Sequence, residues 1–152
     1  MNTLTNVLAT LWEESRTRLE DKIGNITTDD LKKRLPPSPN SIGFLLRHIA
    51  EVELLFAKNV FGAKDTKVIA KTLIAQYDTG EWIHLEEILA MLERSRETLK
   101  NIILQQSDWS NTIETTEFGT RTKAQALGRI TSHTAYHAGQ LGIIIKYGTT
   151  VH

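Results

Sequence analysis

The 152-residue chain has no cysteine, no net charge and no long apolar run. The lack of cysteine excludes disulfides, thiolate metal sites and cysteine nucleophiles, so a metal ion would have to be held by His, Asp or Glu. The 18 Lys and Arg residues are balanced by 18 Asp and Glu residues, so the chain lacks the excess of positive charge that is typical of proteins that bind DNA or RNA. We therefore expect no nucleic-acid partner.

Targeting and membrane segments are not indicated either. The first residues carry no positive charge, and Glu13 and Glu14 interrupt the apolar run that a signal peptide requires. The most apolar segment, residues 141–147, contains Lys146 and is much shorter than the roughly 18 apolar residues of a membrane span. These features predict a soluble, cytoplasmic protein with no membrane partner.

The length predicts a single domain over residues 1–152, which at this size buries about two thirds of its surface without a metal or disulfide. Four segments have helical periodicity and predict an all-α four-helix bundle: 3–23, 41–61, 82–106 and 122–148. In the first segment we expect an inward face formed by the following residues: Leu4, Val7, Leu8, Leu11, Ser15, Leu19 and Ile23.

The segments between these helices are shorter and less regular. Residues 63–80 predict a crossover that contains a short helix, and the Thr-rich stretch 111–121 predicts a small hairpin that turns at Phe118-Gly119. In the last helix, Thr122 and Gln125 fit a capping box. That helix also contains Gly128, Gly139 and Gly142, which together favour close approach by a neighbouring helix or by a second subunit, although any single one of them is equally well explained as a tolerated glycine.

His133 and His137 lie one helical turn apart, so both imidazoles can reach a single ion. The residues around the pair on the same face are apolar, and two unsatisfied imidazoles would be costly there. Taken alone, His48 in the second helix is interpreted as a core histidine bonded to a neighbour, but its depth is similar to that of the pair, which favours a joint site with His48 as a third ligand. His84 and His152 are assigned no role.

Several residues near these histidines have alternative interpretations. Glu51 is a fourth ligand, a carboxylate that orients an imidazole, or a solvated charge, and the solvated charge is slightly favoured. Gln140 either bonds a metal-bound water or substrate or is an ordinary polar residue at the bundle edge. Tyr136 and Trp12 either line a cleft or belong to the core. Candidates for an anion clamp are Arg47 and Arg129.

Three neutral imidazoles suit Zn or Ni, with Fe, Co and Mn as alternatives, and leave a coordination position open for metal-bound water or a thiol. Thr134 stands where the zincin-type peptidase motif has a glutamate, which argues against proteolysis.

Two blocks, residues 39–51 (PNSIGFLLRHIAE) and 133–140 (HTAYHAGQ), resemble the signatures of the DinB-like (YfiT-like) metalloprotein superfamily. The resemblance implies an up-up-down-down-like four-helix bundle with a divalent ion on His48, His133 and His137, and it makes a homodimer plausible. Members include transferases that conjugate low-molecular-weight thiols such as bacillithiol, thiol-dependent isomerases, and stress-linked proteins without an assigned reaction.

The leading hypothesis is accordingly a metal-dependent thiol S-transferase that acts on a small-molecule substrate. The alternatives are a hydrolase that uses metal-bound hydroxide and a metal-binding stress protein without turnover.

Overall fold

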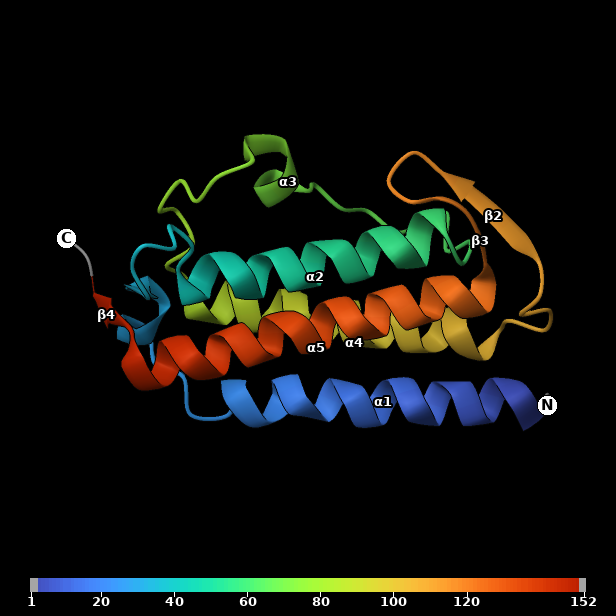
Figure 1. The fold of residues 1–152 in the computed structure, drawn as a ribbon, viewed down its shortest axis with the longest axis horizontal. Helices are drawn as coiled ribbons and strands as arrows, with labels where there is room; N and C mark the ends of the chain where they lie inside the picture. Colours follow the sequence, from blue (N-terminus) through green and yellow to red (C-terminus); the bar gives the residue numbers. More distant parts are fainter. Residues whose placement is uncertain (1–2, 151–152) are drawn as a thin grey trace.

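The computed structural model describes residues 3–150 and is mostly helical. Its elements in chain order are α1 (Thr3–Ile23), the 3-10 turn η1 (Asp29–Lys32), β1 (Lys33–Arg34), α2 (Ile42–Asn59), α3 (Lys71–Ala75), α4 (Leu85–Leu104), β2 (Thr112–Thr115), β3 (Gly119–Thr122), α5 (Lys123–Tyr147) and β4 (Thr149–Thr150). The four long helices pack side by side as the predicted bundle (Figure 1).

The directions of the four helices differ from the up-up-down-down order. Helices α1 and α5 run one way, and α2 and α4 run the other way (Figure 1). Polar contacts at one end agree, because Thr5 of α1 donates to the carbonyl of Gln106 just after α4, and Gln106 Nε2 donates to the carbonyl of Phe61 just after α2. The order is therefore up-down-down-up, because the crossover over residues 60–84 returns the chain along the bundle before α4 begins.

The helix ends follow local sequence signals. Ser41 caps α2 by accepting a hydrogen bond from the amide of Phe44 at 3.2 Å. Thr122 and Gln125 form the predicted capping box of α5. The predicted hairpin is present as β2 paired antiparallel with β3, and the crossover contains the expected short helix, α3. A second small pair, β1 with β4, joins the segment that follows α1 to the residues after α5 and was not predicted.

The predicted inward face of α1 is wrong at Leu4, Val7 and Leu11 but correct at Leu19, which is fully buried. Leu4, Val7 and Leu11 are 51%, 51% and 60% exposed, whereas the buried residues of α1 are Thr5, Ala9, Trp12, Arg16 and Leu19. The helix is rotated so that Trp12 enters the core and Arg16 reaches the fully buried Glu53 of α2, which its Nε contacts at 2.9 Å. This orientation buries the large indole of Trp12 and leaves the buried guanidinium of Arg16 paired with a carboxylate, while part of the leucine stripe stays exposed.

Close backbone approach occurs at Gly43 and not where the glycines of α5 predict it. A Cβ at Gly43 would lie 2.0 Å from the carbonyl oxygen of Trp82. Among residues 3–150, added Cβ atoms at Gly128 and Gly139 would meet nothing within 4 Å, and one at Gly142 would meet the Lys22 side chain at 3.3 Å. The neighbouring-helix explanation is therefore wrong for Gly128 and Gly139, and the second-subunit explanation stays a prediction.

No helix in the described part of the chain combines the length and apolar character needed to cross a bilayer.

Candidate metal centre

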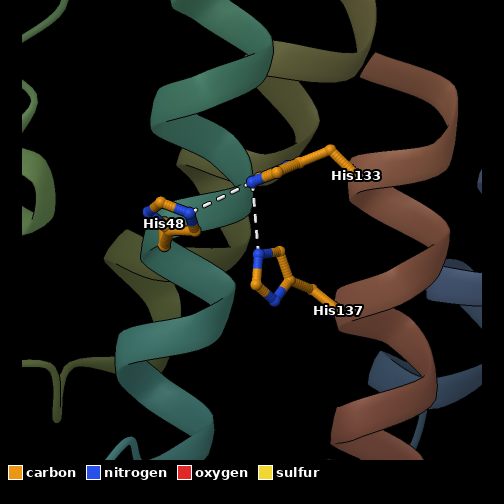
Figure 2. A group of neighbouring side chains, drawn as sticks. All are labelled: His48, His133 and His137. Atoms are coloured by element: carbon orange, nitrogen blue, oxygen red, sulfur yellow. Dashed lines mark hydrogen bonds between the residues drawn. The ribbon is translucent and has the colours of Figure 1, made fainter. Parts of the chain in front are cut away.

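Two helices supply three histidines to one point in the bundle. His48 comes from the middle of α2, while His133 and His137 come from successive turns of α5 (Figure 2). Because α2 and α5 pack against each other, the face of α2 that carries His48 meets the face of α5 that carries the pair. The hypothesis that His48 shares a site with the pair is thus supported by the geometry.

The three rings meet through their Nε2 atoms. His48 Nε2 lies 3.1 Å from His133 Nε2, and His137 Nε2 lies 3.2 Å from the same atom (Figure 2). One ligand atom from each histidine lies within 4.8 Å of the other two, and all three side chains are half-buried. These three residues can therefore hold a metal ion.

The surroundings keep the imidazoles neutral. Burial, and to a smaller extent the charge that His137 would carry, lower the pKa of His48 to about 4. Burial, together with the charges that His137 and His48 would carry, lowers the pKa of His133 to about 3. The pKa of His137 is lowered by burial too, although its hydrogen bond to Gln140 opposes the shift. At neutral pH the rings are uncharged and can present nitrogen lone pairs.

The hydrogen-bond arrangement fits a cation. A neutral imidazole has one N–H, and His137 Nδ1 donates to the side-chain oxygen Oε1 of Gln140 at 2.6 Å, so its Nε2 presents a lone pair. His133 Nε2 faces two other ring nitrogens, and one N–H cannot serve both. Nitrogens bound tetrahedrally to Zn²⁺ at about 2.0–2.1 Å lie about 3.3 Å apart, close to the spacings found here. The donor set and its spacing therefore match a divalent ion.

Glu51 is fully buried, so the favoured interpretation as a solvated charge is wrong. Its Oε1 accepts from the amide of Thr72 at 3.0 Å and from the hydroxyl of Thr72 at 2.5 Å, and its Oε2 accepts from Arg47 Nε at 2.6 Å. The Thr72 oxygen also lies 3.2 Å from His48 Nδ1. The carboxylate therefore reaches the histidine cluster through Thr72.

Thr72 was missed in the sequence because it lies in the crossover, 24 residues from His48. In the structure α3 buries this threonine, while Leu73 and Ile74 beside it are 42% and 75% exposed. A buried polar residue beside exposed apolar residues is the reverse of the usual arrangement, and the sequence alone does not show it.

A surface cleft of about 590 Å³ lies beside the hairpin, and of the three clustered histidines only His133 lines it. Residues from α2, the hairpin and α5 line it, among them Phe56, Glu117, Phe118, Arg129, His133 and Tyr136. The rings of Phe56 and Phe118 stack with centroids 5.8 Å apart, and the Arg129 guanidinium lies 5.2 Å from the Phe118 ring centre. Tyr136 thus lines a cleft, whereas Trp12 is a core residue.

The two candidate clamp arginines have different environments. Arg47 is engaged by Glu51, by the carbonyl of Ile69 and by the Trp82 ring. Arg129 contacts the Phe118 ring and has no hydrogen bond or ion pair to any side chain in residues 3–150.

His84, the other histidine among residues 3–150, does not join the cluster. His84 is exposed just before α4 and lies apart from the three rings. His152 lies outside the described residues.

Comparison with known proteins identifies the family. The sequence profile described as the DinB superfamily matches residues 11–141, a span that includes all three clustered histidines. The chain therefore belongs to the DinB superfamily. No curated protein and no solved structure gave a significant match.

Proposed function

We propose that this DinB-superfamily protein is a metal-dependent transferase that joins a low-molecular-weight thiol to an electrophilic small molecule, with Zn²⁺ or Ni²⁺ held by His48, His133 and His137. The main observation in support of this proposal is that three neutral imidazoles bring their Nε2 atoms close together. A divalent ion bound there would lower the pKa of a thiol and so supply a thiolate near neutral pH. The thiol chemistry itself rests on the family resemblance.

The residues of the chain would hold the ion and position the substrate. Gln140 keeps the proton of His137 on Nδ1, so that Nε2 faces the other rings. The cleft beside His133 offers the aromatic walls of Phe56 and Phe118 to an apolar group. Arg129 would bind an anionic group of the thiol or of its acceptor, because it is one turn before His133 and unpaired within residues 3–150.

The two alternatives have less support. Hydrolysis by metal-bound hydroxide would be helped by a nearby carboxylate that acts as a general base. Glu51 does not suit this role, because its oxygens already accept hydrogen bonds from Thr72 and Arg47. A closed storage or structural site would require a fourth ligand, and the cluster found in residues 3–150 consists of three histidines alone. The open position and the adjoining cleft favour a site that binds small molecules.

Metal analysis of the purified full-length protein tests the ligand assignment. We expect about one equivalent of Zn or Ni per chain in the wild type and a large loss in His137→Ala. The exposed His84→Ala is the matched control and should keep the metal. Unchanged metal content in His137→Ala would exclude the pair as ligands.

A conjugation assay tests the reaction. The metal-loaded protein is mixed with bacillithiol and 1-chloro-2,4-dinitrobenzene, so that the sulfur displaces chloride from the ring and the thiol proton passes to solvent. We expect product formation in the wild type above that of His137→Ala. If no low-molecular-weight thiol reacts, the transferase proposal is wrong even if the metal site is present.

A homodimer stays a prediction of the family resemblance. The exposed stripe of Leu4, Val7 and Leu11 on α1 is an apolar surface that such a dimer could cover. Sedimentation equilibrium of the wild type would measure the oligomeric state directly.

A further inference from the structure

The crossover segment, residues 60–84, lies along α2 and is held there by polar contacts (Figure 1). The carbonyl of Ile69 accepts from Arg47 Nη2 at 3.1 Å. Further along, Asp78 accepts from the amide of Ser41 at 2.8 Å. Between these two points, Thr72 is the buried residue of α3. Because α3 turns its threonine inward and its larger apolar residues outward, apolar packing does not explain where it docks.

The proton of the Thr72 hydroxyl is committed to Glu51. A threonine hydroxyl has one hydrogen, and here it is donated to Glu51 Oε1. The same carboxylate oxygen accepts from the Thr72 amide, which fixes the backbone of α3 relative to α2. Arg47 occupies the other carboxylate oxygen, so Glu51 cannot turn away from Thr72 without breaking that ion pair.

The remaining contact of the Thr72 oxygen is His48 Nδ1, 3.2 Å away. Since the hydroxyl proton points to Glu51, the oxygen can only accept from His48, and this requires the imidazole proton to be on Nδ1. In that tautomer the lone pair of His48 is on Nε2, the atom that faces His133 at 3.1 Å.

We propose that Thr72 is a positioning residue of the histidine cluster: together with Glu51 it holds the proton of His48 on Nδ1 and leaves Nε2 free to bind a metal ion. The crossover thereby contributes to a site whose ligands all come from α2 and α5. Gln140 acts in the same way on His137, whereas His133 Nδ1 has no partner among residues 3–150. The part of this inference that concerns metal affinity rests on the proposed function, but the tautomer of His48 does not.

The test compares Thr72→Val, which removes the hydroxyl at nearly constant volume, with Thr72→Ser, which retains it. Thr134→Val is the matched control, because Thr134 is also buried and its hydroxyl has no partner in residues 3–150. In the metal-free full-length protein, the ¹⁵N shifts of the imidazoles report which nitrogen carries the proton. We expect Nδ1–H for His48 in the wild type, Thr72→Ser and Thr134→Val, and a large population of Nε2–H in Thr72→Val.

Affinity for Zn²⁺ is then measured by competition with a chelating dye. We expect Thr72→Val to bind Zn²⁺ about 10–100-fold more weakly, with Thr72→Ser and Thr134→Val close to the wild type. Thermal unfolding of each variant shows whether the fold is kept, and Thr72→Ala serves if the valine disturbs it.

These measurements distinguish a failure of the inference about Thr72 from a failure of the proposed function. If His48 has the same tautomer in Thr72→Val as in the wild type, the inference is wrong whatever the metal affinity. If the wild type binds neither Zn²⁺ nor Ni²⁺, the proposed function is wrong, and the inference is decided by the nitrogen shifts alone.

Discussion

Replacing Arg16 by alanine should destabilise the bundle far more than an ordinary surface charge does. The Arg16 guanidinium contacts Glu53 through Nε at 2.9 Å and through Nη2 at 3.0 Å, and both side chains are almost completely buried. In Arg16→Ala the carboxylate of Glu53 would keep only the hydroxyl of Ser95, at 2.8 Å, inside the core. An uncompensated buried charge is the expected result.

The size of the effect follows from this environment. Removing one partner of a buried ion pair costs about 3–5 kcal/mol. For a chain of this length, each kcal/mol lowers Tm by about 2–4 °C, so we expect a fall of roughly 6–20 °C. Urea unfolding followed by circular dichroism gives the free energy of unfolding, and calorimetry gives Tm.

Arg96→Ala is the matched control. Arg96 pairs with Glu93 and Glu97 at the surface, where both carboxylates are about half exposed. Exposed pairs contribute at most about 1 kcal/mol, so this variant should unfold close to the wild type. Equal losses in Arg16→Ala and Arg96→Ala would refute the assignment of a structural role to the buried pair.

A double replacement separates charge from packing. Arg16→Met with Glu53→Leu removes both charges and fills much of the same volume, and such exchanges are often neutral or stabilising. The Ser95 hydroxyl, which loses its Glu53 acceptor in this variant, has the carbonyl of Leu92 at 2.9 Å as an alternative acceptor. We therefore expect the double variant to be more stable than Arg16→Ala, and a further loss of stability would contradict this explanation.

Three further predictions concern the site and the helix that positions it. In the metal-free protein, the free energy of unfolding should be constant above pH about 6.5 and fall as the pH drops toward 4. The reason is that His48 and His133 have lowered pKa values in the folded state, so in this pH range the unfolded chain binds more protons than the folded one. Each histidine contributes a slope of at most about 1.4 kcal/mol per pH unit, and urea unfolding in EDTA should show a shallower slope for His133→Leu. Gly43→Ala should cost several kcal/mol, about 3 or more, because its Cβ would collide with the Trp82 carbonyl, and urea unfolding measures this. Arg129→Gln should raise the KM for an anionic thiol about tenfold with little change in kcat or in metal content, whereas an unchanged KM would remove Arg129 from the substrate cleft.

Much of the fold follows from local patterns. Thr3–Ile23 is helical as its periodicity predicts, and Ser41 and Thr122 cap α2 and α5 because their hydroxyls accept from amides three residues ahead. The hairpin was also predictable, since its turn has Gly119 at a positive φ of 71°. Each of these features depends on residues a few positions apart.

The histidine site was predictable in part. His133 and His137 share a face because of helical spacing alone. The similar depth of His48 in its helix and the family resemblance both added His48, which the structure places beside them. Glu51 was misjudged because the partners that bury it, Thr72 and Arg47, act together only after the crossover has docked on α2.

Spacing along the chain was sufficient for the helix limits and for the pairing of two imidazoles, because a helix repeats every 3.6 residues wherever it lies. Spacing could not show which side of α1 turns inward or that a crossover threonine reaches His48. Those outcomes depend on contacts between residues far apart in the sequence, such as the burial of the Trp12 indole in the core and the pairing of Arg16 with Glu53, which local spacing does not encode.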